Sequence, residues 1–104
     1  MTSGHTANLK YNISTCQSGI VLHFQPYTGN TVRDYWHDYV FIPKVHATGI
    51  SVHLSAPNFV NMGTKYLYIY DSKIVGNDDN NTSGTNSGIT NNNALWVMTQ
   101  VIAV

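Results

Sequence analysis

Carboxylate, aromatic and imidazole side chains gather in residues 33–38 of this 104-residue chain, where the sequence reads Arg-Asp-Tyr-Trp-His-Asp. General acid–base catalysis needs carboxylates or histidines that converge on one bond. The chain has no nucleophile-elbow motif and no His-Glu-x-x-His spacing, and such neighbours occur by chance in many loops that contain histidine. We therefore expect a protein that is not an enzyme and has no catalytic residue.

A second polar group comprises Asp71 and residues 77–81, which read Asn-Asp-Asp-Asn-Asn. The first, third and fifth side chains of this run alternate as oxygen ligands do at the start of an EF-hand calcium loop. The sixth position of that loop would be Thr82 instead of glycine, and the twelfth Gly88 instead of glutamate, so the pattern fails. A solvated turn is the better interpretation of these residues.

Histidine and cysteine offer little more for a metal. His23, His46 and His53 could meet across strands, but an outward-facing histidine is usually ordinary polar surface. Cys16 is the only cysteine of the chain, which excludes a thiolate cluster and an intrachain disulfide. We expect no bound metal and no cofactor.

Both polar stretches have the composition of a carbohydrate site. The C–H face of a sugar stacks on an aromatic ring, while Asn, Asp and His side chains hydrogen-bond its hydroxyl groups. We predict these ligand-binding residues: Tyr35, Trp36, His37, Asp38, Asp71, Asn77, Asp78 and Asp79. Trp36 serves equally well as a core or interface anchor, and the three tyrosines of residues 66–70 could instead form a subunit contact.

The charge balance excludes several classes of partner. The chain has five basic and five acidic residues, no glutamate and no cluster of Lys or Arg. Because it lacks the electrostatic footprint of nucleic-acid-binding and membrane-surface proteins, we expect neither nucleic acid nor membrane as a partner. No apolar run approaches the roughly 18 residues of a membrane span, and the start of the chain lacks a signal-peptide pattern. A soluble protein made in the cytoplasm is expected.

The same composition predicts strands in place of helices. Glu, Lys and Arg, the usual solvating residues of helix surfaces, are scarce, whereas Tyr, Val, Ile and Thr favour strands. Alternating or apolar runs predict strands at residues 20–24, 39–42, 50–54, 66–70, 73–75 and 95–104. A turn is predicted at residues 26–30, and residues 39–42 suit a buried strand. About six to eight short strands indicate an all-β sandwich or small barrel.

Two segments leave alternatives open. Residues 76–93 form a polar, low-complexity stretch that is either a long loop or a poorly ordered excursion. In residues 95–104 the odd-numbered side chains should face one way and the even-numbered ones the other, with Trp96 packed in a core or a subunit interface. Both faces of this strand are apolar, so a neighbouring subunit could cover one of them. Small domains without disulfides are often stabilised by oligomerisation.

Five stretches of the chain, taken in order, are similar to one protein family. They are residues 18–24 (SGIVLHF), 39–44 (YVFIPK), 66–71 (YLYIYD), 74–78 (IVGND) and 96–102 (WVMTQVI). In this order they resemble the C-terminal head domains of receptor-binding proteins from siphophages of lactococci and related Gram-positive hosts. The likeness runs from about residue 18 to the end of the chain, and its specificity lies in the order of the stretches.

The resemblance implies a compact, antiparallel Greek-key β-barrel, displayed as a homotrimer in the baseplate at the tip of the phage tail. It implies binding to a host cell-wall polysaccharide or phosphopolysaccharide during adsorption, and attachment to other baseplate proteins through N-terminal domains outside this sequence. Residues 1–104 would then be a single receptor-binding head domain of the virion, made in the host cytoplasm, with residues 1–17 a neck remnant or an artificial start. The ligand-binding residues named above rest on their own chemistry and are not carried over from the family.

Two further hypotheses stand beside this one. A structural baseplate or fibre-tip trimerisation domain would make only protein contacts, and its Tyr and Trp side chains would be buried between subunits. A depolymerase would cut the glycan and would need two carboxylates about 5 to 9.5 Å apart across a cleft. The exposure of the aromatic residues and the arrangement of the five aspartates distinguish the three classes.

Overall fold

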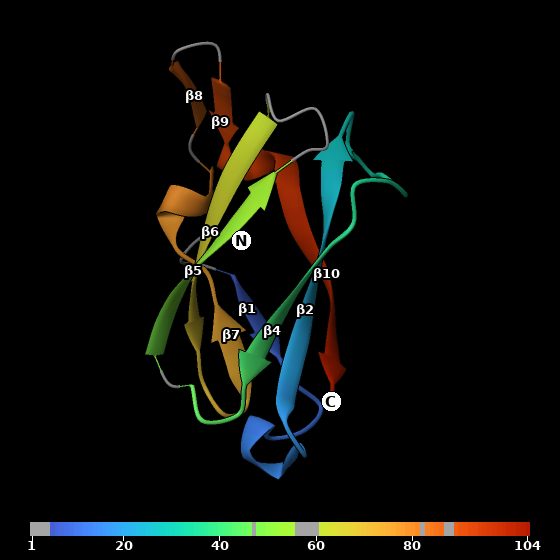
Figure 1. Cartoon of the computed structure of the whole chain (residues 1–104), viewed down its shortest axis with the longest axis vertical. Helices are drawn as coiled ribbons and strands as arrows, with labels where there is room; N and C mark the ends of the chain where they lie inside the picture. Colours follow the sequence, from blue (N-terminus) through green and yellow to red (C-terminus); the bar gives the residue numbers. More distant parts are fainter. Residues whose placement is uncertain (1–4, 47, 56–60, 82, 87–88) are drawn as a thin grey trace.

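Two β-sheets pack face to face in the computed structural model of this protein (Figure 1). The structure describes residues 5–46, 48–55, 61–81, 83–86 and 89–104. Within these ranges it describes the backbone alone for residues 48, 49, 51–55, 61, 62, 79, 81, 83–86 and 89–92. The described residues form a four-stranded and a six-stranded sheet, and the protein is a small all-β sandwich.

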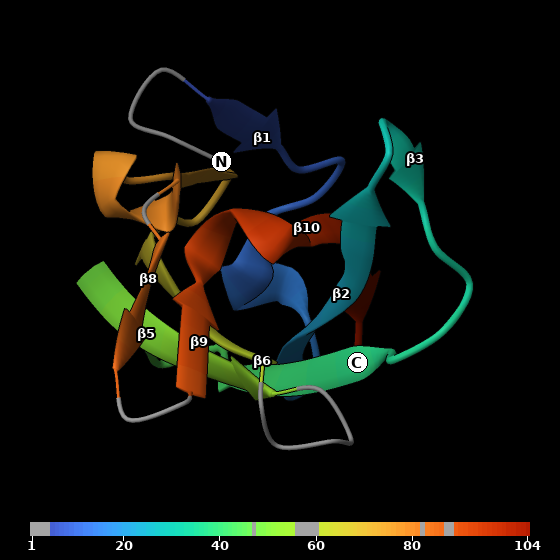
Figure 2. The same cartoon turned by 90° about the horizontal axis from the view of Figure 1, so that it is seen from above.

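β2 (Gly19–Thr28) is the central strand of the four-stranded sheet. β10 (Trp96–Ala103) pairs antiparallel with one edge of it. β4 (Asp38–Pro43) and the short β3 (Thr31–Val32) pair along the other edge, also antiparallel. β3 and the loop that follows it lie on the side of the molecule opposite β5 and β8, as the view along the long axis shows (Figure 2).

The hairpin between β2 and β3 turns at Gly29 and Asn30, whose φ angles are 59° and 60°. Two adjacent residues with positive φ form a turn that matches the twist of paired strands, and Gly and Asn adopt it most readily. The turn predicted at residues 26–30 is confirmed in its second half only, because Pro26 and Tyr27 still belong to β2.

β6 (Asn61–Ile69) is the central strand of the six-stranded sheet. β5 (Thr48–Ser55) pairs antiparallel with nearly the whole length of one edge. At the other edge, the end of β6 pairs with β7 (Lys73–Val75), which pairs in turn with β1 (Thr6–Asn8). Residues 1–17 therefore contribute a strand, β1, to the domain.

The beginning of β6 pairs at this second edge with β9 (Ile89–Asn92), which forms an antiparallel hairpin with β8 (Ser83–Asn86). The β6–β9 pair is parallel, whereas the other strand pairs of both sheets are antiparallel. The described part of residues 76–93 thus contains two strands, and the prediction of one long loop is wrong. These short strands and β1 and β3 bring the described total to ten, above the predicted range.

The helical segments that the structure describes are short 3-10 helices: η1 (Ile13–Thr15), η2 (Asp78–Asn81) and η3 (Asn93–Leu95). η1 places Ile13 in the core, while η2 and η3 pack beside β6. None of the described helices has the length and apolar character to cross a membrane.

Two asparagine side chains occupy the part of the β6 edge that lies between β7 and β9. Asn80 accepts a hydrogen bond from the Tyr66 N–H at 2.6 Å and donates one to the Tyr66 carbonyl at 2.9 Å. Asn93 accepts a hydrogen bond from the Thr64 N–H at 2.7 Å. A buried backbone group without a partner costs free energy, so these side chains stabilise the sheet where a neighbouring strand is missing.

The core between the sheets is built from alternating side chains of both sheets. Its buried members are Ile13, Cys16, Ile20, Leu22, Phe24, Ile42, Leu67, Ile69, Ile74 and Trp96. The alternating burial of Ile20, Leu22 and Phe24, and of Leu67 and Ile69, confirms the strands predicted at residues 20–24 and 66–70. Trp96 is completely buried within one chain, so it packs in the core and not in a subunit interface.

β10 does not alternate regularly. Its pairing with β2 shifts between Met98 and Gln100, which is a β-bulge. A bulge inserts one extra residue and thereby reverses which side chains face the core. Trp96 and Met98 pack against the core before the shift and Val101 packs against it afterwards, so the predicted odd–even division is wrong.

β4 is exposed on its outer face. Tyr39 is 60% exposed and Phe41 is 51% exposed, whereas Ile42 is completely buried. The strand alternates and only one of its faces meets the other sheet. The interpretation of residues 39–42 as a buried strand is therefore wrong.

Candidate binding site

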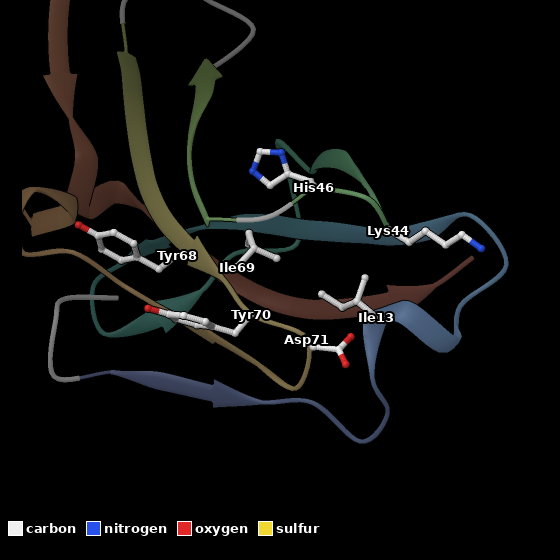
Figure 3. A pocket seen from close by; sticks show the side chains of 7 residues that line it. All are labelled: Ile13, Lys44, His46, Tyr68, Ile69, Tyr70 and Asp71. Atoms are coloured by element: carbon white, nitrogen blue, oxygen red, sulfur yellow. The ribbon is translucent and has the colours of Figure 1, made fainter.

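A cavity of about 510 Å³ opens near the end of the sandwich where β4 and β6 both end (Figures 1 and 3). Its lining comes from η1, from the segment after β4, from the end of β6 and from the turn that leads to β7. The lining residues are Ile13, Lys44, His46, Tyr68, Ile69, Tyr70 and Asp71. A volume of this size is typical of sites for small molecules or single sugar units.

The turn between β6 and β7 positions Asp71 at the cavity. The Tyr70 N–H donates to the Lys73 carbonyl at 2.9 Å, which closes the turn. The Asp71 carboxylate accepts hydrogen bonds from the Ser14 N–H at 2.8 Å and from the Ser14 hydroxyl at 3.1 Å. The Asp71 carbonyl also accepts from the Ile13 N–H at 2.8 Å. The carboxylate is thus held in place by η1 before any ligand binds, which reduces the ordering cost of binding.

Tyrosine rings form the aromatic wall of the cavity. Tyr70 is 49% exposed, and the Lys73 ammonium lies 5.2 Å from the centre of its ring. Tyr68 is half-buried; its hydroxyl accepts from Asn77 Nδ2 at 3.3 Å, and its ring packs edge-on against Tyr66 at 5.2 Å. These contacts restrain the rings, so Tyr70 offers an accessible surface in a limited range of orientations.

Lys44 and His46 lie along one side of the cavity, and Tyr70 and Asp71 lie along the other (Figure 3). The Nε2 atom of His46 is buried and has no hydrogen-bond partner among the residues that the structure describes. A buried polar atom of this kind is normally satisfied by a partner, water or ligand. The cavity therefore offers one positive charge and one negative charge beside an aromatic wall, whereas Nε2 of His46 is buried and not exposed to it.

Among the lining residues that the structure describes, Asp71 is the only carboxylate, whereas glycoside hydrolysis ordinarily uses two. Within the described ranges, no three His, Cys, Asp or Glu side chains come together in a way that would hold a metal ion. Hydrogen bonds, stacking and weak electrostatic contacts are the interactions that this cavity can offer.

The structure separates the two stretches predicted to bind a ligand. The loop between β3 and β4 lies toward the other end of the long axis from the turn between β6 and β7 (Figure 1). Of the predicted residues whose side chains the structure describes, Asp71 alone lines the cavity. Asn77 reaches it indirectly through its hydrogen bond to Tyr68. Asp78 is exposed at the start of η2, and the side chain of Asp79 lies outside the described residues.

The aromatic pair of the first stretch is partly structural. Tyr35 is 45% exposed, and its ring packs edge-on against Trp36 with centres 5.1 Å apart. Trp36 has a φ angle of 51° and packs against the core. A bulky residue rarely adopts positive φ, so the tertiary structure must hold Trp36 in this conformation. The interpretation of Trp36 as an anchor is supported over that of a ligand-stacking ring.

The polar pair of the first stretch is also engaged within the protein. His37 Nδ1 lies 2.8 Å from His23 Nε2, and its Nε2 lies 3.0 Å from the Asp34 carboxylate. Asp38 begins β4, and burial raises the pKa of its carboxyl group. These contacts make His37 and Asp38 parts of the local structure.

Two of the three histidines considered for a metal site lie in different places: His23 is hydrogen-bonded to His37, and His46 lines the cavity. The side chain of His53 lies outside the described residues.

Sequence reasoning missed most of the cavity. The alternation of tyrosines before Asp71 was a usable signal for Tyr68 and Tyr70, because it places both on one face of a strand. Lys44 and His46 carry no such signal, since only the packing of the two sheets brings them to the same cavity.

Comparison with known proteins adds no relative. No protein-family model, no curated protein and no solved structure matches this chain.

Proposed function

We propose that this domain is a non-catalytic binding module that recognises a saccharide in the cavity between Lys44 and Asp71. The observation that carries the proposal is that the half-exposed Tyr70 lines the same cavity as Asp71, whose carboxylate Ser14 already holds in place. Sugar recognition pairs an aromatic surface with a few fixed polar groups.

Each group has a role in this proposal. The C–H face of a sugar ring packs on Tyr70, while hydroxyl groups donate to Asp71. Lys44 donates to a ring or hydroxyl oxygen from the other side. A single open site of this kind binds weakly, in the range of about micromolar to millimolar dissociation constants.

The biological role follows from the sequence resemblance. We propose that the domain is the receptor-binding head of a phage tail protein, which recognises host cell-wall polysaccharide during adsorption. Several copies on one virion would raise the overall affinity by making later binding events intramolecular. In this proposal the heads form a homotrimer and are attached to the baseplate through other parts of the protein.

A structural, trimer-forming domain without glycan binding is the second candidate. It is favoured by the outer face of the four-stranded sheet, where Tyr39 and Phe41 are more than half exposed. Val21 of β2 is paired with Phe41 of β4 on one side and with Ile102 of β10 on the other. Val21 and Ile102 are partly exposed, so they extend the exposed apolar surface of Tyr39 and Phe41 across β2 and β10. Contiguous exposed apolar side chains are typical of contacts between subunits.

Binding of the purified domain to lactococcal cell walls tests the proposal, with the walls used before and after extraction of their polysaccharide. The proposal expects saturable binding that is lost on extraction, together with a trimeric mass in solution. A well-folded trimer that binds neither preparation would favour the structural candidate.

Cavity variants locate the site. Tyr70→Ala should weaken binding about fivefold, because an aromatic contact contributes about 1 kcal/mol. Asp71→Asn keeps the size and the acceptor of the carboxylate and should weaken binding through loss of charge. Tyr35→Ala is the matched control, since it removes an exposed tyrosine away from the cavity. Equal losses in Tyr35→Ala and Tyr70→Ala would place the site elsewhere.

A further inference from the structure

A chain of hydrogen-bonded side chains links the loop after β3 to the sheet. It runs from Asp34 through His37 and His23 to Gln100 on β10. The ring centres of the two histidines are 5.0 Å apart and their planes differ by 24°. With nitrogens 2.8 Å apart, this geometry is that of two nearly coplanar rings joined edge to edge, not of stacked rings.

The bond between the two rings limits how many protons they can hold. One ring nitrogen must carry the hydrogen and the other must be bare. His37 donates to Asp34 from its other nitrogen, and His23 meets Gln100 Oε1 at 3.4 Å with its own. If Gln100 Oε1 accepts a hydrogen bond from His23 Nδ1–H, the two rings carry one proton more than two neutral imidazoles. If the Gln100 amide is flipped so that its NH₂ group donates to His23 Nδ1, both rings are neutral. A second extra proton would place N–H groups on both facing nitrogens and break the bond.

The charged neighbours in the loop would do little to offset a second positive charge. Asp34 is 98% exposed, so water weakens its attraction for the imidazole rings. The Arg33 guanidinium is positive and donates to the Thr28 hydroxyl at 2.8 Å. Neither group can compensate fully for two adjacent imidazolium ions.

Among the described residues, the flanking strands β4 and β10 bring no negative charge to the histidine pair that would offset a second positive charge. From β4, Tyr39 stacks on His23 with ring centres 4.3 Å apart, and its phenol is neutral. Asp38, next along β4, faces the opposite side of the sheet from Tyr39. β10 contributes the neutral Gln100. Since His23 is only 8% exposed, the doubly charged pair is unfavourable where it stands.

The loop depends on this bond for part of its order. Its beginning is held where the Arg33 N–H donates to the Pro26 carbonyl at 2.8 Å and Gln25 Nε2 donates to the Arg33 carbonyl at 3.1 Å. Between this point and β4, the contacts described are the packing of Trp36 on the core and the bonds of His37. Loss of the bond to His23 would leave the strained Trp36 as the main restraint.

We propose that the His23–His37 hydrogen bond is a proton-operated latch on residues 34–37. The latch is closed while the pair holds at most one extra proton, and a second proton opens it and frees the loop with its exposed Tyr35. Acidification is the trigger, because it supplies the second proton to an imidazole. This latch does not depend on the saccharide proposal, because the cavity lies elsewhere.

Backbone relaxation measured by NMR on the whole domain tests the latch between about pH 8 and about pH 5. Order parameters of residues 34–37 should fall from about 0.85, typical of rigid backbone, to below about 0.6, typical of flexible backbone. His37→Gln keeps a hydrogen-bonding side chain but cannot take up the proton, and its loop should show the same order at both ends. His46→Gln is the matched control and should retain the transition.

Three results would overturn the proposal. The first is a loop that stays equally ordered throughout in the unaltered domain, and the second is a His37→Gln loop that loosens as the unaltered one does. The third is read from the imidazole nitrogen signals of the unaltered domain, which needs no variant to fold. Rings that remain hydrogen-bonded to each other at the acid end would show that no latch opens.

Discussion

Replacing Lys65 by Met tests how the interior of the six-stranded sheet accommodates a positive charge. Lys65 is only 2% exposed, and its ammonium donates to the Asn80 carbonyl at 3.0 Å. Burial lowers the pKa of Lys65 from 10.5 to about 8. The charged form is therefore less favourable in the folded protein than in the unfolded chain.

The sign of the pH dependence follows from these two values. Between them the unfolded chain binds more protons than the folded protein, so the free energy of unfolding rises with pH. The free-energy cost of burying Lys65, relative to the unfolded chain, is about 3 kcal/mol at about pH 7 and falls to about 1 kcal/mol at about pH 9.5, because the folded protein loses the proton first. We expect the domain to gain about 2 kcal/mol of stability across this interval from Lys65 alone.

Urea unfolding at several pH values in this interval measures the effect. Lys65→Met should be at least as stable as the unaltered domain near neutral pH and should lack the rise, because it has no proton to lose. Lys73→Met is the control, since Lys73 is exposed and its removal should leave the rise intact. The interval ends below pH 10 because of Tyr11, whose pKa is raised first by burial and second by the neighbouring Cys16. A tyrosine with a raised pKa lowers the stability of the folded protein at higher pH.

The reasoning is refuted if the unaltered domain shows a flat profile, or if Lys65→Met rises as steeply. A flat profile would mean that water or a local rearrangement solvates the ammonium in the folded state. An equal rise in the variant would assign the effect to other groups.

Three further changes test the packing of the sheets. Asn80→Ala removes the side chain that hydrogen-bonds both the N–H and the carbonyl of Tyr66. The free energy of unfolding measured in urea should fall by about 2 to 4 kcal/mol, and a loss below about 0.5 kcal/mol would contradict the role of Asn80 in the sheet. Gly19→Ala should cost at least about 3 kcal/mol or prevent folding, because an added Cβ would collide with the Ile42 carbonyl and Gly19 has a φ of 155°; normal thermal unfolding of this variant would contradict that. Because burial raises the pKa of Asp38, the domain should lose stability as pH rises from about 4 through that raised pKa. Asp38→Asn should remove this loss, and unfolding measured in acid would then show a flatter dependence of stability on pH.

Much of the strand pattern was predictable because it depends on local alternation. Ile20, Leu22 and Phe24 lie two positions apart along the chain, and they face the core as the period of a strand requires. The same reasoning failed in β10, where the bulge lies between Met98 and Gln100. A bulge depends on how a strand pairs with its neighbour, and local alternation contains no information about that pairing.

Residues 76–93, which are rich in asparagine, also show that local sequence patterns do not predict long-range pairing. Their composition is that of a loop, and it predicts nothing about Asn80 and Asn93 serving as substitutes for a strand. That role exists only because β7 and β9 leave part of the β6 edge uncovered. The gap is a property of strand order, which long-range contacts decide.

The sequence by itself determined an all-β fold and placed Asp71 and a tyrosine-bearing strand next to each other. Only the tertiary structure decided that Lys44 and His46 face them across a cavity, and that His37 is bonded to His23. The physical reason is the range of the interactions. Alternation and turn preferences act over a few residues, whereas a cavity and a histidine pair require segments far apart in the chain to meet when the sheets pack.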